Sequence, residues 1–276
     1  MTGERKGAAA LERVLAVMAR LRDPEGGCPW DLAQDFRSLL PHTLEEAYEV
    51  AAAVEAGDPM ALREELGDLL FQVVFHARLA EERGWFGFAE VAATLAEKLV
   101  RRHPHVFGDE PAPPSREALH RRWEAQKEAE RRARGAASVL DGVPRALPAL
   151  VRAVKLQRRA ARLGFDWPDR EGPLAKVAEE LAELREALEA GERLGRLEHE
   201  LGDLLFACAN LARHLGVEPE QALRRAGERF ERRFRRVEAA LAREGGRTDL
   251  ERLEALWREA KRAEAAREGS GRGGEA

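Results

Sequence analysis

The chain has 276 residues, of which 44% are hydrophobic, 35% are charged and 6% are aromatic, a composition that favours a helical water-soluble protein over a β-sandwich. Its net charge of −4 creates no general attraction to nucleic acid. The sequence shows neither a signal peptide nor an apolar stretch long enough to span a bilayer, so we expect a cytoplasmic protein with no membrane partner.

Helical patterns begin near the N-terminus. Apolar residues within 11–21 recur at helical spacing, and the Asp-Pro and Gly-Gly pairs within 23–27 end that helix. The segment 28–36 is expected to be non-helical. Thr43, with Glu46 three residues later, matches a capping box and predicts the start of the next helix.

A long helix is predicted from Pro59 to about Arg83, after a turn that contains Gly57 and Pro59. The proline-rich segment 108–115 is typical of a linker, and a polar helix follows it. A second break lies at 142–148. We therefore predict an N-terminal domain at 9–110, a linker with a helix at 111–145, a C-terminal domain at 146–266 and a disordered tail at 267–276.

The two halves of the chain share four landmarks in the same order. Each landmark recurs after 131 to 135 residues, which is strong support for two copies of one domain and too long a period for a solenoid. The landmarks are Glu-Glu-x-x-Glu at 45–49 and 179–183, Glu-Leu-Gly-Asp-Leu-Leu-Phe at 65–71 and 200–206, a basic motif at 97–102 and 228–233, and Trp-x-x-x-Lys at 123–127 and 257–261.

The first two landmarks predict a metal site. Acids three residues apart lie on nearly one face of a helix, and two such helices joined by a short turn let four carboxylates converge. Clustered carboxylates repel one another and need cations. Oxygen ligands with no partnering His or Cys favour Mg²⁺, with Mn²⁺ as the alternative, over zinc. The acids are Glu46, Glu49, Glu65 and Asp68 in the first copy and Glu180, Glu183, Glu200 and Asp203 in the second.

The acids also interrupt apolar stripes that we expect to face the core. Glu65 lies among Leu62, Leu66, Leu69 and Val73, and Glu200 lies among Leu197, Leu201, Leu204 and Cys208. An uncompensated acid in a core costs several kcal/mol. A buried salt-bridge network is the alternative to a metal, and either copy could be kept only for its fold. Gly67 and Gly202 interrupt good helices, either for close approach of a ligand or for helix packing.

The later landmarks carry basic and aromatic residues. Metals together with arginines are what a polyphosphate requires, although a solvated basic face would have the same spacing. A Trp could stack on a base while the following Lys reaches phosphate, but a place in the core is the more common role for either Trp taken alone. The residues are Lys98, Arg101, Arg102, Trp123 and Lys127 in the first copy and Arg229, Arg232, Arg233, Trp257 and Lys261 in the second.

These motifs, together with Arg-Arg-His-Pro-His-Val-Phe-Gly-Asp at 101–109 and Gly-Phe-Asp-Trp at 164–167, resemble the two-domain bacterial MazG nucleoside triphosphate pyrophosphohydrolases. The resemblance runs from about Leu11 to Lys261. It implies an all-α fold of two tandem MazG-like domains, whose four-helix-bundle-type cores are completed by dimerisation. It also implies hydrolysis of NTP or dNTP to monophosphate and pyrophosphate, broad base tolerance, a homodimer and a role in clearing non-standard nucleotides.

The resemblance further implies that the second copy carries the main activity, with Mg²⁺ as its cofactor. The acids at positions 180, 183, 200 and 203 would be the metal ligands, and the first-copy acids a second possible site. Glu64 in the first copy corresponds to His199 in the second, so the second site departs slightly from the usual pattern. Substrate contacts would be Lys176, Glu179, His199, Arg229, Arg232, Arg233, Trp257 and Lys261, and the catalytic residues would be Glu179, Glu180, Glu200, Arg229 and Arg233.

We expect water to attack the α-phosphorus, with either Glu179 or Glu180 assisting its deprotonation. A non-catalytic nucleotide-binding or protein-interaction scaffold is the alternative function. Nucleic-acid binding through the basic segment 232–236 is a third interpretation, and the net charge argues against it.

Overall fold

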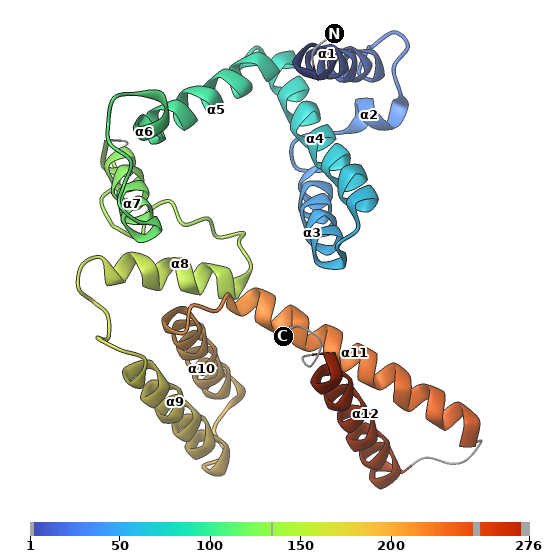
Figure 1. The fold of residues 1–276 in the computed structure, drawn as a ribbon, viewed down its shortest axis with the longest axis vertical. Coiled ribbons are helices and arrows are strands. Elements are labelled where there is room, and N and C mark those ends of the chain that lie inside the picture. The colour runs from blue at the N-terminus through green and yellow to red at the C-terminus, as the bar shows by residue number, and fades with distance from the viewer. Residues whose placement is uncertain (1–2, 134, 245–248, 272–276) are drawn as a thin grey trace. The chain divides into compact units, whose positions relative to one another are not determined.

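A computed structural model describes residues 3–133, 135–244 and 249–271, and every regular element in these ranges is a helix. The all-α prediction is therefore confirmed (Figure 1). The chain divides into two compact units between Gln126 and Lys127. The helices are α1 Gly3–Leu21, α2 Pro29–Ala33, α3 Leu40–Ala56, α4 Pro59–Glu82, α5 Phe88–Arg102, α6 Pro104–Phe107, α7 Arg116–Ala133, α8 Ala149–Ala161, α9 Glu171–Glu189, α10 Leu194–His214, α11 Pro219–Glu244 and α12 Leu250–Gly271.

The α3–α4 hairpin is the main helix pair of the first unit (Figure 1). Gly57 ends α3 in the left-handed conformation, with φ of 67°, which only glycine adopts without strain. Asp58 then caps α4 by accepting hydrogen bonds from the backbone N–H groups of Met60 and Ala61. This turn makes the two helices antiparallel and places the acids of both on one hairpin.

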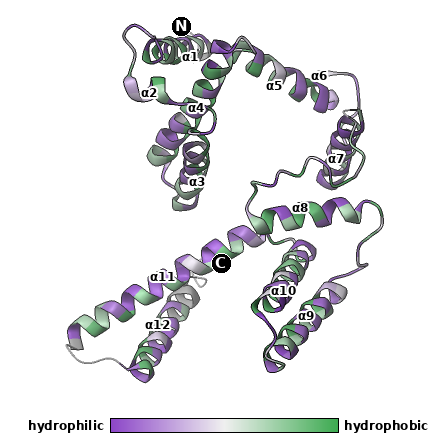
Figure 2. Cartoon of the chain, turned by 180° about the vertical axis from the view of Figure 1, so that it is seen from behind, coloured by the Kyte–Doolittle hydropathy of each residue, from purple (hydrophilic) through white to green (hydrophobic). Residues whose placement is uncertain are grey.

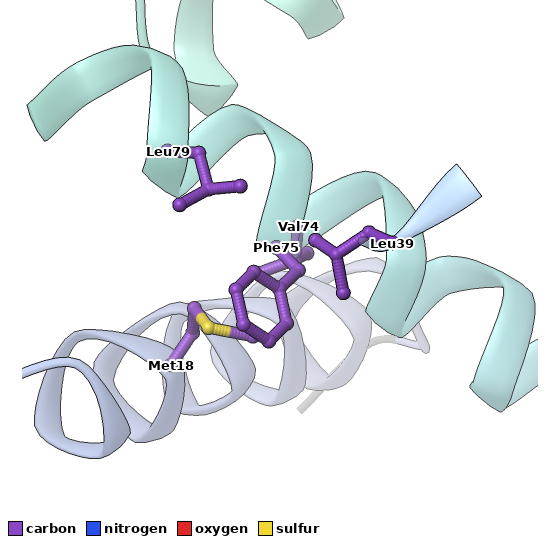
Figure 3. Close-up of a cluster of buried hydrophobic side chains, with 5 residues drawn as sticks. All are labelled: Met18, Leu39, Val74, Phe75 and Leu79. Carbon is purple, nitrogen blue, oxygen red and sulfur yellow. The ribbon is translucent and has the colours of Figure 1, made fainter. Parts of the chain in front are cut away.

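The core of the first unit lies where α1 crosses α4 (Figure 3). Met18 of α1 and Leu39 meet Val74, Phe75 and Leu79 of α4, and each of these side chains is at most 4% exposed. Full burial of such residues stabilises the fold by roughly 1.5–3 kcal/mol each. The core therefore anchors the C-terminal half of α4, while the half that carries Glu65 projects beyond it.

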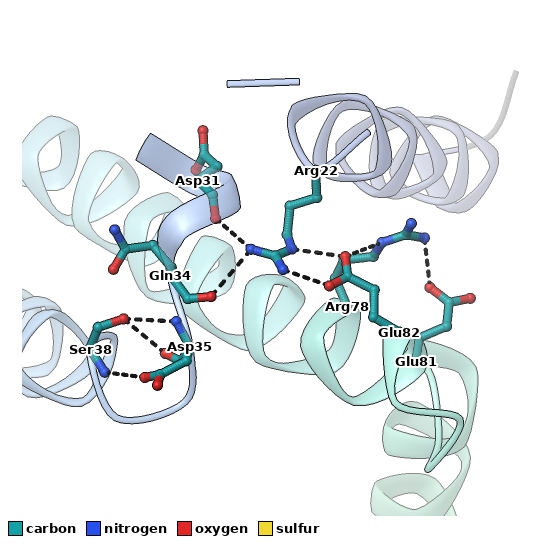
Figure 4. A network of polar contacts seen from close by, with 8 residues as sticks. All are labelled: Arg22, Asp31, Gln34, Asp35, Ser38, Arg78, Glu81 and Glu82. Atoms are coloured by element: carbon teal, nitrogen blue, oxygen red, sulfur yellow. Dashed lines mark hydrogen bonds and ion pairs between the residues drawn. The ribbon is translucent and has the colours of Figure 1, made fainter. Parts of the chain in front are cut away.

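Arg22 ties the segment around α2 to α4 (Figure 4). Its Nε and Nη2 donate to the carboxylate of Glu82 at 2.8 and 2.6 Å, and its Nη1 donates to the Asp31 carbonyl. These hydrogen bonds are the first cause of the lowered pKa of the Glu82 carboxyl. The Arg22 side chain is only 9% exposed. Its contacts therefore hold the segment that leads into α3 from a buried position.

Two local predictions for this unit are wrong. The segment expected to be non-helical contains α2, which begins at Pro29, a residue suited to a first helical position. Thr43 does not cap α3, which already begins at Leu40. Instead its hydroxyl donates to the Leu39 carbonyl at 3.0 Å and lies 3.0 Å from Nε2 of His76 on α4, so it joins α3 to its partner helix.

In the second unit, α9 and α10 form a hairpin, α8 packs on α10, and α11 pairs with α12. Ala153 and Val154 of α8 pack against Ala209, which is fully buried. Gln157 donates to the Phe206 carbonyl at 2.8 Å. Figure 2 shows that α7 is mostly hydrophilic, whereas hydrophilic and hydrophobic residues alternate along α11. The second unit thus repeats the acid-bearing hairpin of the first.

The predicted core-facing stripes are only partly covered. Leu66 and Val73 on α4 are 50% and 42% exposed, and Leu201 on α10 is 47% exposed. The stripe prediction is wrong for a single chain because the described part of each unit supplies no helix to cover these residues. At the C-terminus, α12 continues through residues 267–271 of the expected disordered tail, and the remaining five residues lie outside the described ranges. Among the described residues, no helix is long and apolar enough to cross a membrane.

Candidate active site

The acids of the second copy converge as the spacing predicts. Glu180 and Glu183 lie one turn apart on α9 and face Glu200 on α10, with one carboxylate oxygen of each within 4.8 Å of the others. Asp203 forms a second such group with Glu200 and His199. Glu200 belongs to both groups, and its side chain is only 1% exposed. The hairpin therefore presents four carboxylates, of which those of Glu180 and Glu200 are buried.

Two cations neutralise the buried acids in the second copy. Lys176 Nζ lies 2.7 Å from both Glu179 and Glu180, and these hydrogen bonds raise the pKa of Lys176, that to Glu179 contributing most. Arg196, one turn before Glu200 on α10, holds Glu200 Oε1 at 2.6 Å. Arg196 was not predicted from the sequence, although its i,i+4 spacing to Glu200 is visible there.

Each of the two buried acids keeps one oxygen without a partner. Oε2 of Glu180 and Oε2 of Glu200 are buried and accept no hydrogen bond, a costly state for a carboxylate. Desolvation, then the charges of Glu180 and Glu200, raise the pKa of Glu183. Unsatisfied carboxylate oxygens facing one another are suitable ligands for a hard divalent cation. The donor set therefore fits Mg²⁺ or Mn²⁺.

Replacing Arg196 should destabilise the metal-free protein and the metal should restore it. In Arg196→Met the buried Glu200 loses its permanently charged partner. We expect the free energy of unfolding to fall by about 2 kcal/mol in EDTA, less than for a fully buried pair because Arg196 is 54% exposed. Urea denaturation with EDTA or excess Mg²⁺ measures this, with Arg185→Met on exposed α9 surface as the control. An equal loss in both conditions would count against a shared role of Arg196 and the metal.

The first copy forms a more acidic cluster. Glu46, Glu49 and Glu65 converge within the same 4.8 Å limit, and the charge of Asp68 acts on two of them. His42 occupies the position of Lys176 and lies 3.7 Å from Glu45, while Ala61 occupies the position of Arg196. Desolvation and then a hydrogen bond with Glu49 raise the pKa of Glu46, and desolvation raises that of Glu65. The copies therefore differ in counter-charge, beyond the difference between Glu64 and His199.

The raised pKa values of Glu46 and Glu65 predict that these two acids stabilise the metal-free protein less as the pH rises. Above the ordinary glutamate pKa of 4.5, the folded chain binds more protons at Glu46 and Glu65 than the unfolded chain does. Their contribution is complete below that pH and is lost as the pH rises through the raised values. Urea denaturation over a pH series in EDTA should show Glu46→Gln gaining stability relative to the wild type as the pH rises. Glu12→Gln, on exposed α1 surface, should keep the wild-type slope, and an unchanged slope in Glu46→Gln would contradict the prediction.

The predicted phosphate-binding residues gather on the α11–α12 pair. Arg232 and Arg233 of α11 both bind the carboxylate of Glu264 on α12, at 3.0 and 2.5 Å. The Arg233 guanidinium lies 5.9 Å from the Trp257 ring, and the Phe230 ring centroid lies 5.2 Å from that of Trp257. The Trp257 ring is thus occupied by protein neighbours. Glu264 was missed because nothing local marks it as a partner of residues 31 and 32 positions away.

Arg229 and Lys261 flank this group. Arg229 is half-buried one turn before Arg233, and Lys261 is exposed on α12. The basic segment considered for nucleic-acid binding is largely paired within the chain: besides the two arginines on Glu264, Arg235 lies 3.5 Å from Glu231 and Arg236 donates to the Ala260 carbonyl. Because these arginines are paired within the chain, the segment does not present a bare basic surface to nucleic acid.

The acids and the arginines remain two separate groups in one chain. Among the described residues, no hydrogen bond or ion pair joins the α9–α10 acids to Arg229, Arg232 or Arg233, and Figure 1 shows the α9–α10 and α11–α12 pairs as distinct hairpins. The predicted site residues thus lie together within each group, but the two groups are not in contact with each other in a single chain.

Comparison with known proteins identifies both copies. The MazG nucleotide pyrophosphohydrolase domain matches residues 34–107 and 170–237, which include both acid clusters. The chain is 51% identical over 258 residues to the nucleoside triphosphate pyrophosphohydrolase of Escherichia coli (strain K12), covering 92% of this chain and 98% of that protein. It is 42% identical over 254 residues to the nucleoside triphosphate pyrophosphohydrolase/pyrophosphatase MazG of Thermotoga maritima, covering 91% and 95%. A similar enzyme of Mycobacterium tuberculosis is 41% identical over 156 residues, or 56% of this chain and 46% of that protein.

Proposed function

The chain belongs to the MazG nucleotide pyrophosphohydrolase family, and on that premise we propose that it hydrolyses nucleoside and deoxynucleoside triphosphates to the monophosphate and pyrophosphate. The reaction requires Mg²⁺, for which Mn²⁺ substitutes. The observation that carries the proposal is the pair of buried acids, Glu180 and Glu200, each with one oxygen that has no partner. A bound Mg²⁺ would lower the pKa of water and polarise the phosphoryl oxygens.

The protein's own residues supply the rest of the chemistry. Glu180, Glu183, Glu200 and Asp203 would hold the metal. Lys176 keeps Glu179 and Glu180 oriented on α9 through its two 2.7 Å contacts, and either acid is suited to take a proton from the attacking water. Arg229, Arg232 and Arg233 would offset the negative charge that develops on the departing pyrophosphate.

Product analysis tests this proposal directly. The full-length protein is incubated with ATP and Mg²⁺ in ¹⁸O-labelled water, and the nucleotides, phosphate and pyrophosphate are separated and weighed. We expect AMP that carries the label, unlabelled pyrophosphate, and no turnover in EDTA. Formation of ADP and phosphate would contradict the proposed bond cleavage. Binding of ATP without turnover would instead support the non-catalytic scaffold.

We propose that the enzyme tolerates many bases and removes non-standard nucleotides from the cytoplasmic pool. The residues that carry the proposal are acids and arginines, which recognise metal and phosphate rather than base edges. The free thiols Cys28 and Cys208 suit a reducing compartment. Values of kcat/KM for the common NTPs and dNTPs that differ by more than about 100-fold, roughly 2.7 kcal/mol, would argue for a base-specific pocket.

We propose that the active form is a homodimer. Apolar side chains on both acid-bearing hairpins are exposed in the single chain, among them Leu66, Leu70 and Val73 on α4 and Leu201 and Leu205 on α10. A Cβ added at Gly67 or Gly202 would meet nothing within 4 Å, which leaves room for another helix. A second chain would cover these faces and would bring arginines close to the acids. Sedimentation equilibrium should give twice the mass of the chain, and a monomer with full activity would contradict the proposal.

A further inference from the structure

Glu264 is the most enclosed acid of α12 among the described residues. It is only 8% exposed, yet it lies opposite the polar face of α11. Its Oε1 accepts from Arg232 Nη2 at 3.0 Å and its Oε2 accepts from Arg233 Nε at 2.5 Å. A single carboxylate therefore holds two guanidinium groups, and hydrogen bonds from Arg233 and then Arg232 lower its pKa.

The contact orients the arginines without exhausting their donors. Arg233 uses Nε toward Glu264, which leaves its terminal Nη groups as further hydrogen-bond donors. On another side, its guanidinium lies 5.9 Å from the Trp257 ring. Carboxylate and ring together hold a flexible side chain in one orientation. Two arginines and one carboxylate also leave a net positive charge, which suits an anion.

We propose that Glu264 is a positioning residue that presents Arg232 and Arg233 to the phosphate chain of the substrate; this rests on the proposed function. Glu264 lies beyond the family-matched segment 170–237. Its counterpart at the repeat spacing is Glu130, seven residues after Trp123 as Glu264 is seven after Trp257. The acid therefore extends the repeated unit by one further element: arginines, Trp-Lys, then Glu.

A purely structural role, in which Glu264 only joins α11 to α12, is the competing explanation. Such a role would lower stability and leave the activity of the folded fraction unchanged. Replacement by apolar residues of similar size often stabilises proteins as well as a buried ion pair does, so helix joining alone does not require this acid. A positioning role requires that the effect of Glu264 on catalysis passes through Arg232 and Arg233.

The test compares Glu264→Gln with Glu254→Gln in the full-length protein. Glu254 lies on the same helix and pairs with Arg258 at 2.9 Å, with both side chains more than half exposed. We expect Glu264→Gln to lower kcat for ATP hydrolysis about 10- to 100-fold, with KM changed less. Glu254→Gln should stay within about twofold of the wild type, as expected for an exposed pair. Glu264→Asp, which keeps the charge, should recover part of the loss.

A mutant cycle with the Arg232→Ala/Arg233→Ala pair separates the two explanations. If Glu264 acts through the arginines, Glu264→Gln should cost about twofold or less in that background. The inference is overturned if the wild type turns over ATP and Glu264→Gln keeps its kcat, or if the loss is equally large in both backgrounds. If the wild type shows no turnover, the proposed function fails, and calorimetric binding of an α,β-methylene ATP analogue takes over as readout. Unchanged binding in Glu264→Gln then overturns the inference, and binding weakened about tenfold supports it.

Discussion

Glu180→Gln combined with Glu200→Gln should lower NTP hydrolysis by at least about 10³-fold, since each substitution removes a proposed metal ligand and a bound Mg²⁺ would supply several kcal/mol of barrier reduction. Glutamine preserves size, and it relieves the burial of a charge, so the variant should fold. Glu200 is shared by both carboxylate groups of the second copy, which is why its loss cannot be offset by a neighbour. Steady-state release of pyrophosphate from ATP measures the effect.

The matched control is Glu186→Gln with Glu198→Gln. It makes the same charge change on α9 and α10 at exposed positions outside the carboxylate groups, and its activity should stay near that of the wild type. Binding of Mn²⁺, followed by electron paramagnetic resonance, provides a second readout. A Glu180→Gln/Glu200→Gln protein that still turned over at the wild-type rate would place the chemistry in the first copy.

Arg233→Ala should lower kcat by about 10²–10³-fold, the range measured when one donor that stabilises developing charge is removed. Arg233 is held by two neighbours: it contacts Glu264 and lies over the ring of Trp257, and it is 23% exposed. Arg233→Lys keeps the charge but loses the planar fork, so it should recover only part of the rate.

Arg235→Ala is the control for that substitution. Arg235 lies two residues away on α11, is 78% exposed and pairs only loosely with Glu231 at 3.5 Å, so its loss should change kcat by less than about twofold. Steady-state kinetics of the two variants side by side give the comparison. An effect of Arg235→Ala as large as that of Arg233→Ala would indicate general electrostatic attraction rather than a placed donor.

The fold was largely predictable because its signals are local and repeated. Gly57, Asp58 and Pro59 specify the turn between α3 and α4 through left-handed backbone, side-chain capping and a missing N–H. Thr43 misled because the same pattern serves a capping box and a tertiary contact, and only the position of His76 on α4 decides between them. The apolar stripes were assigned to the core of the chain because periodicity identifies a buried face without saying which molecule covers it.

The site was predictable where the spacing within a helix determines proximity. Glu180 and Glu183, one turn apart, and their convergence with Glu200 across a short turn followed from helical geometry. Arg196 was overlooked because arginines are abundant and i,i+4 pairs are usually solvent-exposed. Glu264 could not be found, because its contacts with Arg232 and Arg233 depend on how α12 packs on α11.

We propose that the second carboxylate cluster cleaves nucleoside triphosphates to monophosphate and pyrophosphate with Mg²⁺. The most direct measurement quantifies AMP and pyrophosphate formed from ATP by two full-length variants, each with one cluster disabled. Glu46→Gln/Glu65→Gln should form both products in equal amounts near the wild-type rate, and Glu180→Gln/Glu200→Gln should form neither. Retained product formation by the second variant, with loss in the first, would contradict the account.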